Sequence, residues 1–254
     1  MPLSVTVETR LMKRTNTLLI MLALLVPGLT VAQWAEFPTG DLDSRTIRTQ
    51  EKVESLYERG DYKRAHFIYS NELARQGDKY AQYMTGYMYL MGQGVEEDPV
   101  KAVAWYRIAA ERHAPEFIAV RDQVLQTLDD EQRARSDELY VELRKECSDI
   151  VVVMGLLAAD LKSMKSFRTG SRLPANATSV VVVDPKTGRA VSADHVRNRY
   201  LRNVQIRVDF VTDRLEIDKI DAEDVSHQME SLWERVRDYT SVVGDEPDSL
   251  YASP

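Results

Sequence analysis

One segment constrains the fold of this chain more than any other, because its small and aromatic residues follow the spacing of two antiparallel helices in close contact. The segment runs from residue 81 to residue 111, and small side chains recur in both halves, at Ala81, Gly86, Ala102 and Ala109. Small residues allow two helices to approach closely, and aromatic side chains fill the space between them. A glycine inside a helix costs roughly 1 kcal/mol relative to alanine, so Gly86 needs a packing reason. The segment therefore predicts a helix-turn-helix unit.

The residues between the two halves fit the turn. Gly92 and Gly94 end the first helix, Asp98 can accept the free amide hydrogens of the second helix, and Pro99 falls at its first position. We expect Gly86→Leu to destabilise the unit far more than Gly94→Ala, because Gly86 faces another helix whereas Gly94 lies in a loop.

This combination of residues resembles the Sel-one-like repeat (SLR) family, a relative of the tetratricopeptide repeat. The residues that define the repeat are Ala81, Tyr83, Gly86, Gly92, Gly94, Asp98, Pro99, Ala102, Trp105, Tyr106, Ala109 and Ala110. We assign Tyr83, Trp105 and Tyr106 to its core. The resemblance implies an α-solenoid with a concave interaction surface, used as a scaffold or adaptor. The N-terminal pattern described below predicts an exported bacterial member of the family.

Further helix pairs flank this unit. Residues 64–77 repeat its second helix at a shift of 37 residues, and a shorter helix pattern precedes them. Ala114 and Pro115 open another helix, and residues 129–131 begin the one after it, where acidic side chains favour a helix start. The chain is therefore predicted to be mainly α, with about three helix pairs over residues 45–146. Three pairs are near the minimum that buries a continuous core.

The N-terminus has the three-part order of a secretory signal peptide. Lys13 and Arg14 precede an apolar run over residues 18–26, and small residues lead to Ala32. Cleavage after Ala32 gives a mature chain that begins at Gln33 and is periplasmic or secreted.

Two features of this end leave alternatives open. Residues 1–11 precede a second methionine, Met12, which is a candidate for the true start. An uncleaved inner-membrane anchor is the alternative to cleavage, although the apolar run is shorter than the roughly 20 residues of a membrane span. Membrane contact is expected only in that case.

The second half of the chain departs from the repeat pattern. Residues 150–159 form an apolar run that fits a helix capping the repeats, and residues 178–184 read as a β-strand. Residues 196–211 suit either a helix or a strand, and we favour helix for the first part only. A second strand is expected over residues 215–220 and an amphipathic helix over 221–239, which together make a small C-terminal α+β unit.

These patterns divide the chain into successive parts. They are an N-terminal extension with the signal peptide (1–32), a linker (33–44), the helical repeats (45–146), a capping helix (147–165), a linker (166–177), the α+β unit (178–240) and an acidic tail (241–254).

Composition and motifs argue against chemistry and against nucleic acid as a ligand. The net charge is -7, which gives no bulk attraction for phosphates. His66, His113, His195 and His227 lack any zinc-binding spacing, and no glycine-rich phosphate loop or Gly-x-Ser-x-Gly motif is present. We therefore expect no metal, no cofactor and no catalytic residue. Cys147 is the only cysteine, either a reactive thiol or a small buried residue at a helix end.

The function predicted from sequence is an exported scaffold that binds a protein or peptide partner through the concave face of its repeats. Tyr87 and Tyr89 are the candidate partner-binding residues, because residues two apart cannot share one helix face and at least one should reach solvent. The alternative is a cell-envelope enzyme, or an accessory protein of one, with its activity in residues 176–240. A cleft with converging Asp, His or Lys side chains in that region would favour the alternative.

Overall fold

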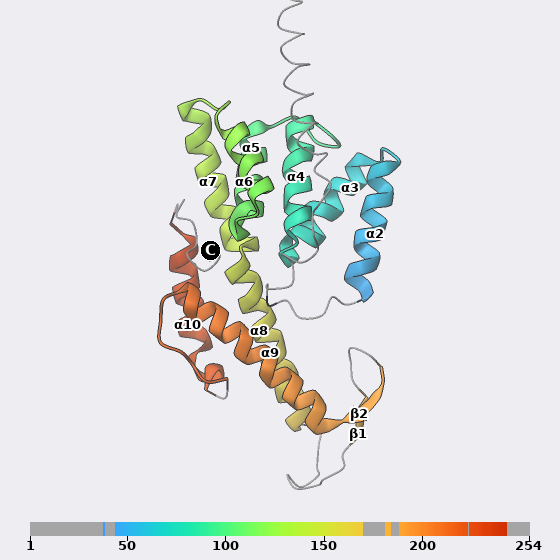
Figure 1. Ribbon diagram of the computed structural model, residues 1–254, viewed down its shortest axis with the longest axis vertical. Helices are drawn as coiled ribbons and strands as arrows, with labels where there is room; N and C mark the ends of the chain where they lie inside the picture. Colours follow the sequence, from blue (N-terminus) through green and yellow to red (C-terminus); the bar gives the residue numbers. More distant parts are fainter. Residues whose placement is uncertain (1–37, 39–43, 170–180, 184–187, 223, 243–254) are drawn as a thin grey trace, which may run out of the picture. The chain divides into compact units, whose positions relative to one another are not determined.

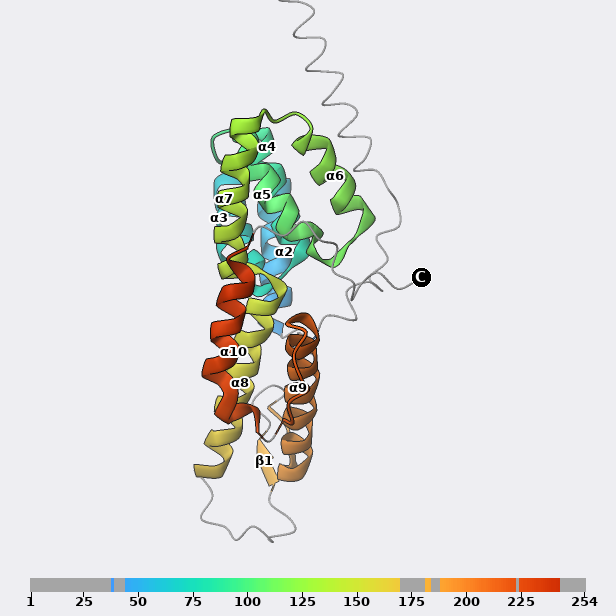
Figure 2. The same ribbon diagram turned by 90° about the vertical axis from the view of Figure 1, so that its left-hand side faces the viewer.

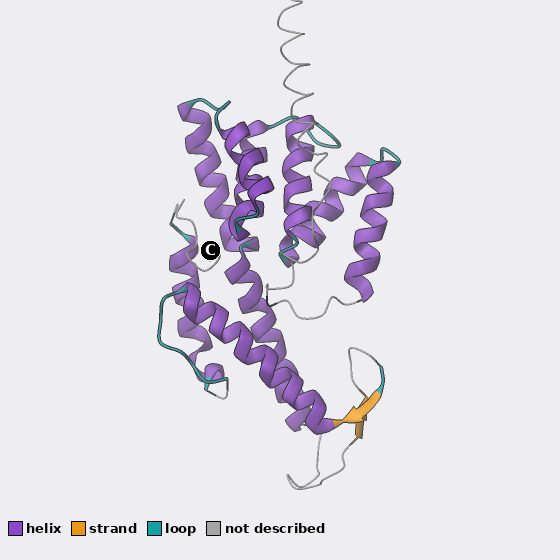
Figure 3. Ribbon diagram, in the orientation of Figure 1, coloured by secondary structure: helices purple, strands orange, loops and turns teal. Residues whose placement is uncertain are grey.

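The computed structural model describes residue 38 and residues 44–169, 181–183, 188–222 and 224–242, and this part is mainly helical (Figures 1 and 3). The predicted signal peptide with Ala32 and Gln33, and the tail after residue 242, lie outside the described residues. Most of each predicted linker lies outside them as well. None of the described helices is long and apolar enough to cross a membrane.

The predicted three helix pairs occupy the first part of the described chain. They are α2 (Ser44–Glu58) with α3 (Tyr62–Ile68), α4 (Lys79–Met91) with α5 (Pro99–Ala109), and α6 (Pro115–Leu125) with α7 (Asp130–Cys147). Helix α3 continues through a π-helical turn, η2 (Tyr69–Leu73), and a 3-10 turn, η3 (Ala74–Gln76), and α5 ends in a 3-10 turn, η4 (Ala110–Arg112). The most extensive contact between the described helices joins α4 to α5.

The helix ends follow from local side-chain chemistry. The side chains of Asp78 and Asp98 each accept a hydrogen bond of 3.0 Å from a backbone amide in the first turn of α4 and α5. Pro99 occupies the first turn of α5, where its missing N–H does no harm. Gly92 ends α4 in the left-handed conformation with φ 63°. Helix α7 begins with a capping box at Asp129, as its acidic first turn predicts.

Two glycines of the repeat, Gly86 and Gly94, have less free space around them than the sequence suggests, and one expectation about them is wrong. A Cβ on Gly86 would lie 3.0 Å from the Tyr106 ring and 3.1 Å from the Ala102 carbonyl, so Gly86 does face α5. Gly94, with φ 76°, is also closely covered: a Cβ there would lie 2.5 Å from the backbone carbonyl of Tyr62. The Gly94 loop therefore rests against the start of α3, and Gly94→Ala is not the mild change that we expected.

A second group of elements follows α7. It comprises α8 (Asp149–Thr169), β1 (Val181–Val183), β2 (Ala190–Ser192), α9 (Ala193–Arg214) and α10 (Val225–Thr240). Helix α8 packs along α9 and also contacts α10, and the three helices lie side by side in both views (Figures 1 and 2). Strands β1 and β2 pair antiparallel, with Val182 opposite Val191. The C-terminal unit is thus largely helical and includes the helix that we predicted only as a cap for the repeats.

Two expectations for this region are wrong. Helix spans all of residues 193–214 rather than the first part only, because Val204, Val208 and Val211 form one fully buried stripe at helical spacing. Ile206, which alternates with the valines in the strand interpretation, is 54% exposed.

The second error is the strand over residues 215–220, which is a turn followed by irregular chain. Its backbone groups pair locally instead of with a neighbouring strand. The Ile217 amide donates to the Thr212 carbonyl at 3.0 Å, and the Gln205 side chain donates to the Ile220 carbonyl and accepts from the Ala222 amide. This segment therefore connects α9 to α10 without joining a sheet.

Candidate functional site

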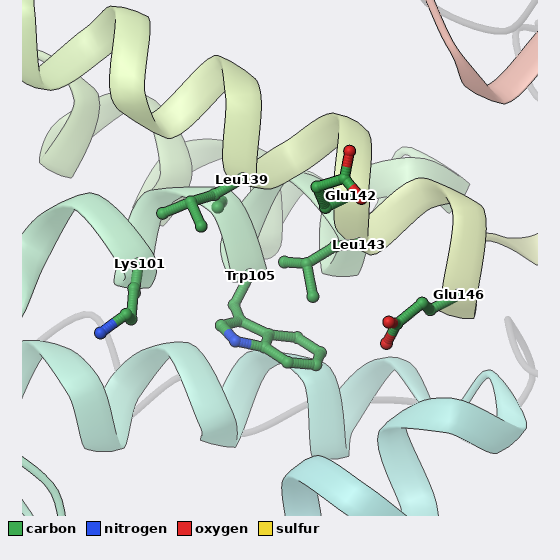
Figure 4. Close-up of a pocket in the computed structure, with 7 residues that line it drawn as sticks. Lys101, Trp105, Leu139, Glu142, Leu143 and Glu146 are labelled. Carbon is green, nitrogen blue, oxygen red and sulfur yellow. The ribbon is translucent and has the colours of Figure 1, made fainter.

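The repeat surface has a groove between α5 and α7, and Trp105 lines part of it (Figure 4). We call it the α5–α7 groove. Its lining residues are Asp98, Lys101, Ala104, Trp105, Arg135, Asp137, Glu138, Leu139, Val141, Glu142, Leu143 and Glu146. It consists of a cavity of about 130 Å³ around Trp105 and a shallower one of about 650 Å³ toward the start of α7. Lys101, Leu139 and Glu142 line both, so the two cavities are parts of one groove.

The sequence of α5 explains why Trp105 lines a groove. Tyr106 and Ala102 face α4, where they meet Gly86. The residue next to Tyr106 must then point elsewhere, since adjacent residues on a helix lie about 100° apart. Trp105 is partly buried and packs against the core, as do Leu139 and Leu143, which lie one turn apart on α7. All three side chains line the same cavity. Figure 4 shows the indole ring close to Leu143, between Lys101 and Glu146. Trp105 therefore packs against the core, as the sequence predicts, but it is only partly buried and also lines the groove.

The rim of the α5–α7 groove is charged, and several of its charges are paired at the surface. Lys101 pairs with Asp98 at 3.0 Å, Glu142 with Lys145 at 2.7 Å, and Glu146 with Arg75 at 2.9 Å. Glu138 is exposed and has no ion pair among the described residues. An apolar floor with a polar rim is the arrangement found at protein interfaces.

The structure separates the two tyrosines that we predicted as partner-binding residues. Tyr87 is only 6% exposed, so it belongs to the core and the prediction for it is wrong. Tyr89 is partly exposed, but its ring is already in contact on two sides. His66 meets it edge-on with 4.9 Å between ring centroids, and the Lys101 ammonium lies 5.4 Å from its centroid. Neither tyrosine lines the α5–α7 groove.

The structure also bears on the predictions about metal ligands and Cys147. In the described part of the chain, no group of His, Cys, Asp and Glu has the arrangement of a metal site. Cys147 is buried, and its thiol donates to the Leu143 carbonyl at 3.2 Å. Burial raises the pKa of the Cys147 thiol to about 12, which keeps it protonated. The structure therefore favours the structural interpretation of this cysteine over a reactive thiol.

A buried group of four charged residues lies beside Cys147, and no pattern in the sequence indicates it. We call Lys79, Glu111, Arg112 and Asp149 the junction network. The Lys79 ammonium lies 2.8 Å from Glu111 and 3.1 Å from Asp149, and Arg112 donates two hydrogen bonds of 2.8 Å to the Asp149 carboxylate. Lys79 begins α4, Glu111 and Arg112 follow α5, and Asp149 begins α8. The network thus joins both ends of the repeat to the C-terminal unit.

The charges of the junction network balance, so its role is structural. Asp149 is fully buried, which by itself raises the pKa of its carboxyl group. The positive charges of Lys79 and Arg112 more than offset that effect and hold the pKa at about 2. The Asp149 carboxylate is therefore ionised at every physiological pH.

A second set of contacts ties α7 to its neighbours by stacking cations on aromatic rings. The Arg107 guanidinium of α5 lies 4.0 Å from the Tyr140 ring centroid, and Arg107 also pairs with Asp137. Arg144 of α7 lies 4.9 Å from the ring centroid of Tyr239 in α10. Helix α7, one wall of the groove, is thereby fixed from both sides.

These features define a class: a helical-repeat protein with an apolar groove on its repeats and a helical C-terminal unit. Comparison with protein families agrees with this description. Residues 79–113 match the Sel1 repeat, so the chain contains a repeat of the Sel1-like family at α4 and α5. Sel1 repeats generally mediate protein–protein interactions and are typically non-catalytic. No curated protein and no solved structure matches the chain.

Proposed function

We propose that this protein is an exported scaffold that binds a protein or peptide partner through the α5–α7 groove. The observation that carries the proposal is the position of Trp105, a large apolar side chain of the Sel1 repeat that lines the α5–α7 groove. Tryptophan is among the residues that contribute most to binding energy at protein interfaces. The groove replaces Tyr87 and Tyr89 as the proposed contact surface.

The rigidity of the groove supports this function. Both walls are helices held by further contacts, α5 by its close packing on α4 and α7 by the stacking of Arg107 and Arg144. A surface that is ordered before binding loses less conformational entropy when a partner docks. The α5–α7 groove is therefore suited to binding without rearrangement.

The alternative, an enzymatic activity in residues 176–240, has less support. The groove lies outside that range, and at least one buried charged side chain within it is held by contacts with other parts of the chain. Arg207, for example, is buried, pairs with Asp160 of α8 and donates to the Pro38 carbonyl at 3.0 Å. No observation on the described part of this range favours chemistry.

Export is part of the proposal and rests on the sequence alone. The signal-peptide pattern of residues 13–32 predicts that the mature chain begins at Gln33. N-terminal sequencing of the exported protein tests this. Retention of residues 12–32 in a membrane fraction would replace the cleaved form by the anchored one.

Site-specific photo-crosslinking in the producing cell tests the binding function. A photoreactive residue at Glu142, on the groove rim, should give an adduct with a discrete partner, and one at Arg48 on α2 should not. Trp105→Ala should remove the adduct. Trp233→Ala on α10 is the matched control and should keep it. Equal adducts at both positions, or an adduct that survives Trp105→Ala, would refute the assignment of the groove.

A further inference from the structure

The α5–α7 groove offers apolar contact and no excess of one charge. Its acidic side chains are Asp98, Asp137, Glu138, Glu142 and Glu146, and the basic side chains that line it or pair with these are Lys101, Arg135, Arg107, Lys145 and Arg75. The cavity beside Trp105 has Ala104, Leu139 and Leu143 in its lining. A segment that docks there is therefore selected by its apolar side chains.

The end of α10 is held on α7, the helix that forms one wall of the groove. The backbone carbonyl of Val242, just after α10, accepts a hydrogen bond from the Arg144 guanidinium. The same guanidinium lies 4.9 Å from the ring centroid of Tyr239 in α10. Arg144 directly follows Leu143, which lines the cavity with Trp105. The chain beyond Val242 thus leaves from a fixed point on the wall of the groove.

The chain beyond Val242 is long enough to reach the groove. The path round half of a helix of about 10–12 Å diameter, such as α7, is roughly 16–19 Å. Eight extended residues, from 243 to 250, span about 26 Å. Leu250 and Tyr251 are therefore within reach of the cavity. They are two adjacent large apolar side chains, and the other residues from 244 to 254 are acidic, small or proline.

A segment of the same chain needs little affinity of its own to occupy the groove. Attachment through a short linker gives an effective concentration in the millimolar range. The docked state is then well populated even if the separate segment binds with Kd of about 1 mM. The same apolar contact made by a second copy of the chain at micromolar concentration would stay almost unpopulated. Attachment therefore favours residues 243–254 as the occupant.

We propose, on the basis of the proposed function, that residues 243–254 dock in the α5–α7 groove and compete with the partner. Leu250 and Tyr251 cover Trp105 beside Leu139 and Leu143. A partner has to displace them, so its apparent affinity is lower than its affinity for the open groove. The chain thereby regulates access to its own binding site.

The fluorescence of Trp105 reports on docking in the purified protein. The chain from Gln33 to Pro254 with Trp34→Phe and Trp233→Phe keeps Trp105 as the single tryptophan of the three. Acrylamide quenches an exposed indole more efficiently than a covered one. The quenching constant of Trp105 therefore measures how far the ring is covered.

Two paired substitutions in the segment separate its apolar side chains from its charges. Leu250→Ser with Tyr251→Ser should raise the quenching constant of Trp105 about twofold, because the ring loses its cover. Asp245→Ser with Asp248→Ser is the matched control. It changes the same segment but keeps both apolar side chains, and it should alter the constant by less than about 20%, since exposed ion pairs contribute little.

Photo-crosslinking locates the docked segment. A photoreactive residue at Glu142 should form an adduct within the chain, on the peptide that contains Leu250 and Tyr251, and mass spectrometry identifies it. The same residue at Arg48 on α2 should not. In the producing cell, Leu250→Ser with Tyr251→Ser should increase the partner adduct at Glu142 about threefold, because the competitor is removed.

Several outcomes would overturn the inference. These are an unchanged quenching constant after Leu250→Ser with Tyr251→Ser, no adduct between Glu142 and residues 243–254, and an adduct that joins two chains instead. A partner adduct that depends on Trp105 but not on Leu250 and Tyr251 would also overturn it and would leave the proposed function intact. An adduct within the chain in cells that yield no partner adduct would support the docking and refute the proposed function.

Discussion

Two contacts made by the Sel1 repeat are stabilised by different physical means. The contact between α4 and α5 depends on shape, because Gly86 leaves room for the Tyr106 ring at a distance that one added carbon would fill. The contact between the repeat and α8 depends on charge, through the junction network of Lys79, Glu111, Arg112 and Asp149. The first contact forms between two helices that follow each other in the sequence. The second joins residues more than thirty positions apart.

The difference between the two contacts explains which of them tolerates amino-acid substitution. A close-packed contact loses stability in proportion to the misfit introduced, and it can relax. A buried charge network cannot lose one member without leaving the others desolvated and unpaired, so its response is abrupt. The repeat should therefore tolerate graded substitution and its junction with α8 should not.

The largest effect is expected for Asp149→Ala. Removing the carboxylate takes away the counter-charge that the buried Lys79 ammonium and the Arg112 guanidinium both contact. Breaking a buried ion pair on one side costs about 3–5 kcal/mol of unfolding free energy. Urea denaturation followed by circular dichroism measures it. Asp149→Asn, which keeps the shape, should cost a similar amount, and a loss below about 1 kcal/mol in either variant would show that the network does not stabilise the junction.

The two glycines come next, with losses of about 1–3 kcal/mol each. Gly86→Leu forces the Tyr106 ring away, whereas Gly94→Ala both strains a backbone at φ 76° and meets the Tyr62 carbonyl. We therefore expect comparable shifts in the urea midpoints of the two variants. Gly155→Ala on α8, where a Cβ has open space, is the control and should not destabilise. A midpoint for Gly94→Ala equal to wild type would show that the loop moves away from α3 without cost.

Acid should lower the free energy of unfolding by an amount of the order of 2 kcal/mol, through the loss of the Asp149 charge at the junction. The pKa of Asp149 falls from 3.8 to about 2 in the folded chain, so its stabilising contribution is complete above about pH 4 and is lost as the pH drops through 2. Unfolding free energies between pH 4 and pH 2 should fall more steeply for wild type than for Asp149→Asn. Identical slopes would contradict the assigned pKa.

The smallest effect is expected at the exposed counterpart of the junction network. Arg75 and Glu146 form an ion pair of 2.9 Å, as short as the buried ones, but the two side chains are 49% and 51% exposed. Exposed pairs are worth about 0–1 kcal/mol. Glu146→Ala should therefore change the urea midpoint little. A loss comparable to that of Asp149→Ala would mean that distance, and not burial, sets the strength of these pairs.

Local patterns were enough to predict the repeat, because its signals come from residues near each other in the chain. Asp98, Pro99 and Gly92 mark helix ends through bonds within three or four residues. The helix over residues 193–214 was harder, since valines at 204, 208 and 211 fit a helix while alternation from 204 to 210 fits a strand. Only packing along α8 decides between them.

The sequence did not predict most of the candidate site, because the residues of the site are far from each other in the chain. The α5–α7 groove brings together residues more than thirty positions apart, and nothing in α5 alone shows that α7 leaves Trp105 partly open. One local signal was available: Leu139 and Leu143 lie one turn apart among glutamates at 138, 142 and 146. That pattern marks an amphipathic helix edge, but it does not identify the facing helix.

The position of Asp149 also bears on how repeat proteins of this kind can evolve. Helix α8 begins two residues after α7 ends, and its first side chain reaches back to both termini of the Sel1 repeat. Solenoids commonly lengthen by tandem duplication, which inserts a new helix pair between existing ones. An insertion between α7 and α8 would carry Asp149 away, so that the positive charges of Lys79 and Arg112 would exceed the negative charge of Glu111. The junction thus fixes the length of the array at this end, and variation in this lineage is expected on the surface of the groove rather than in the number of repeats.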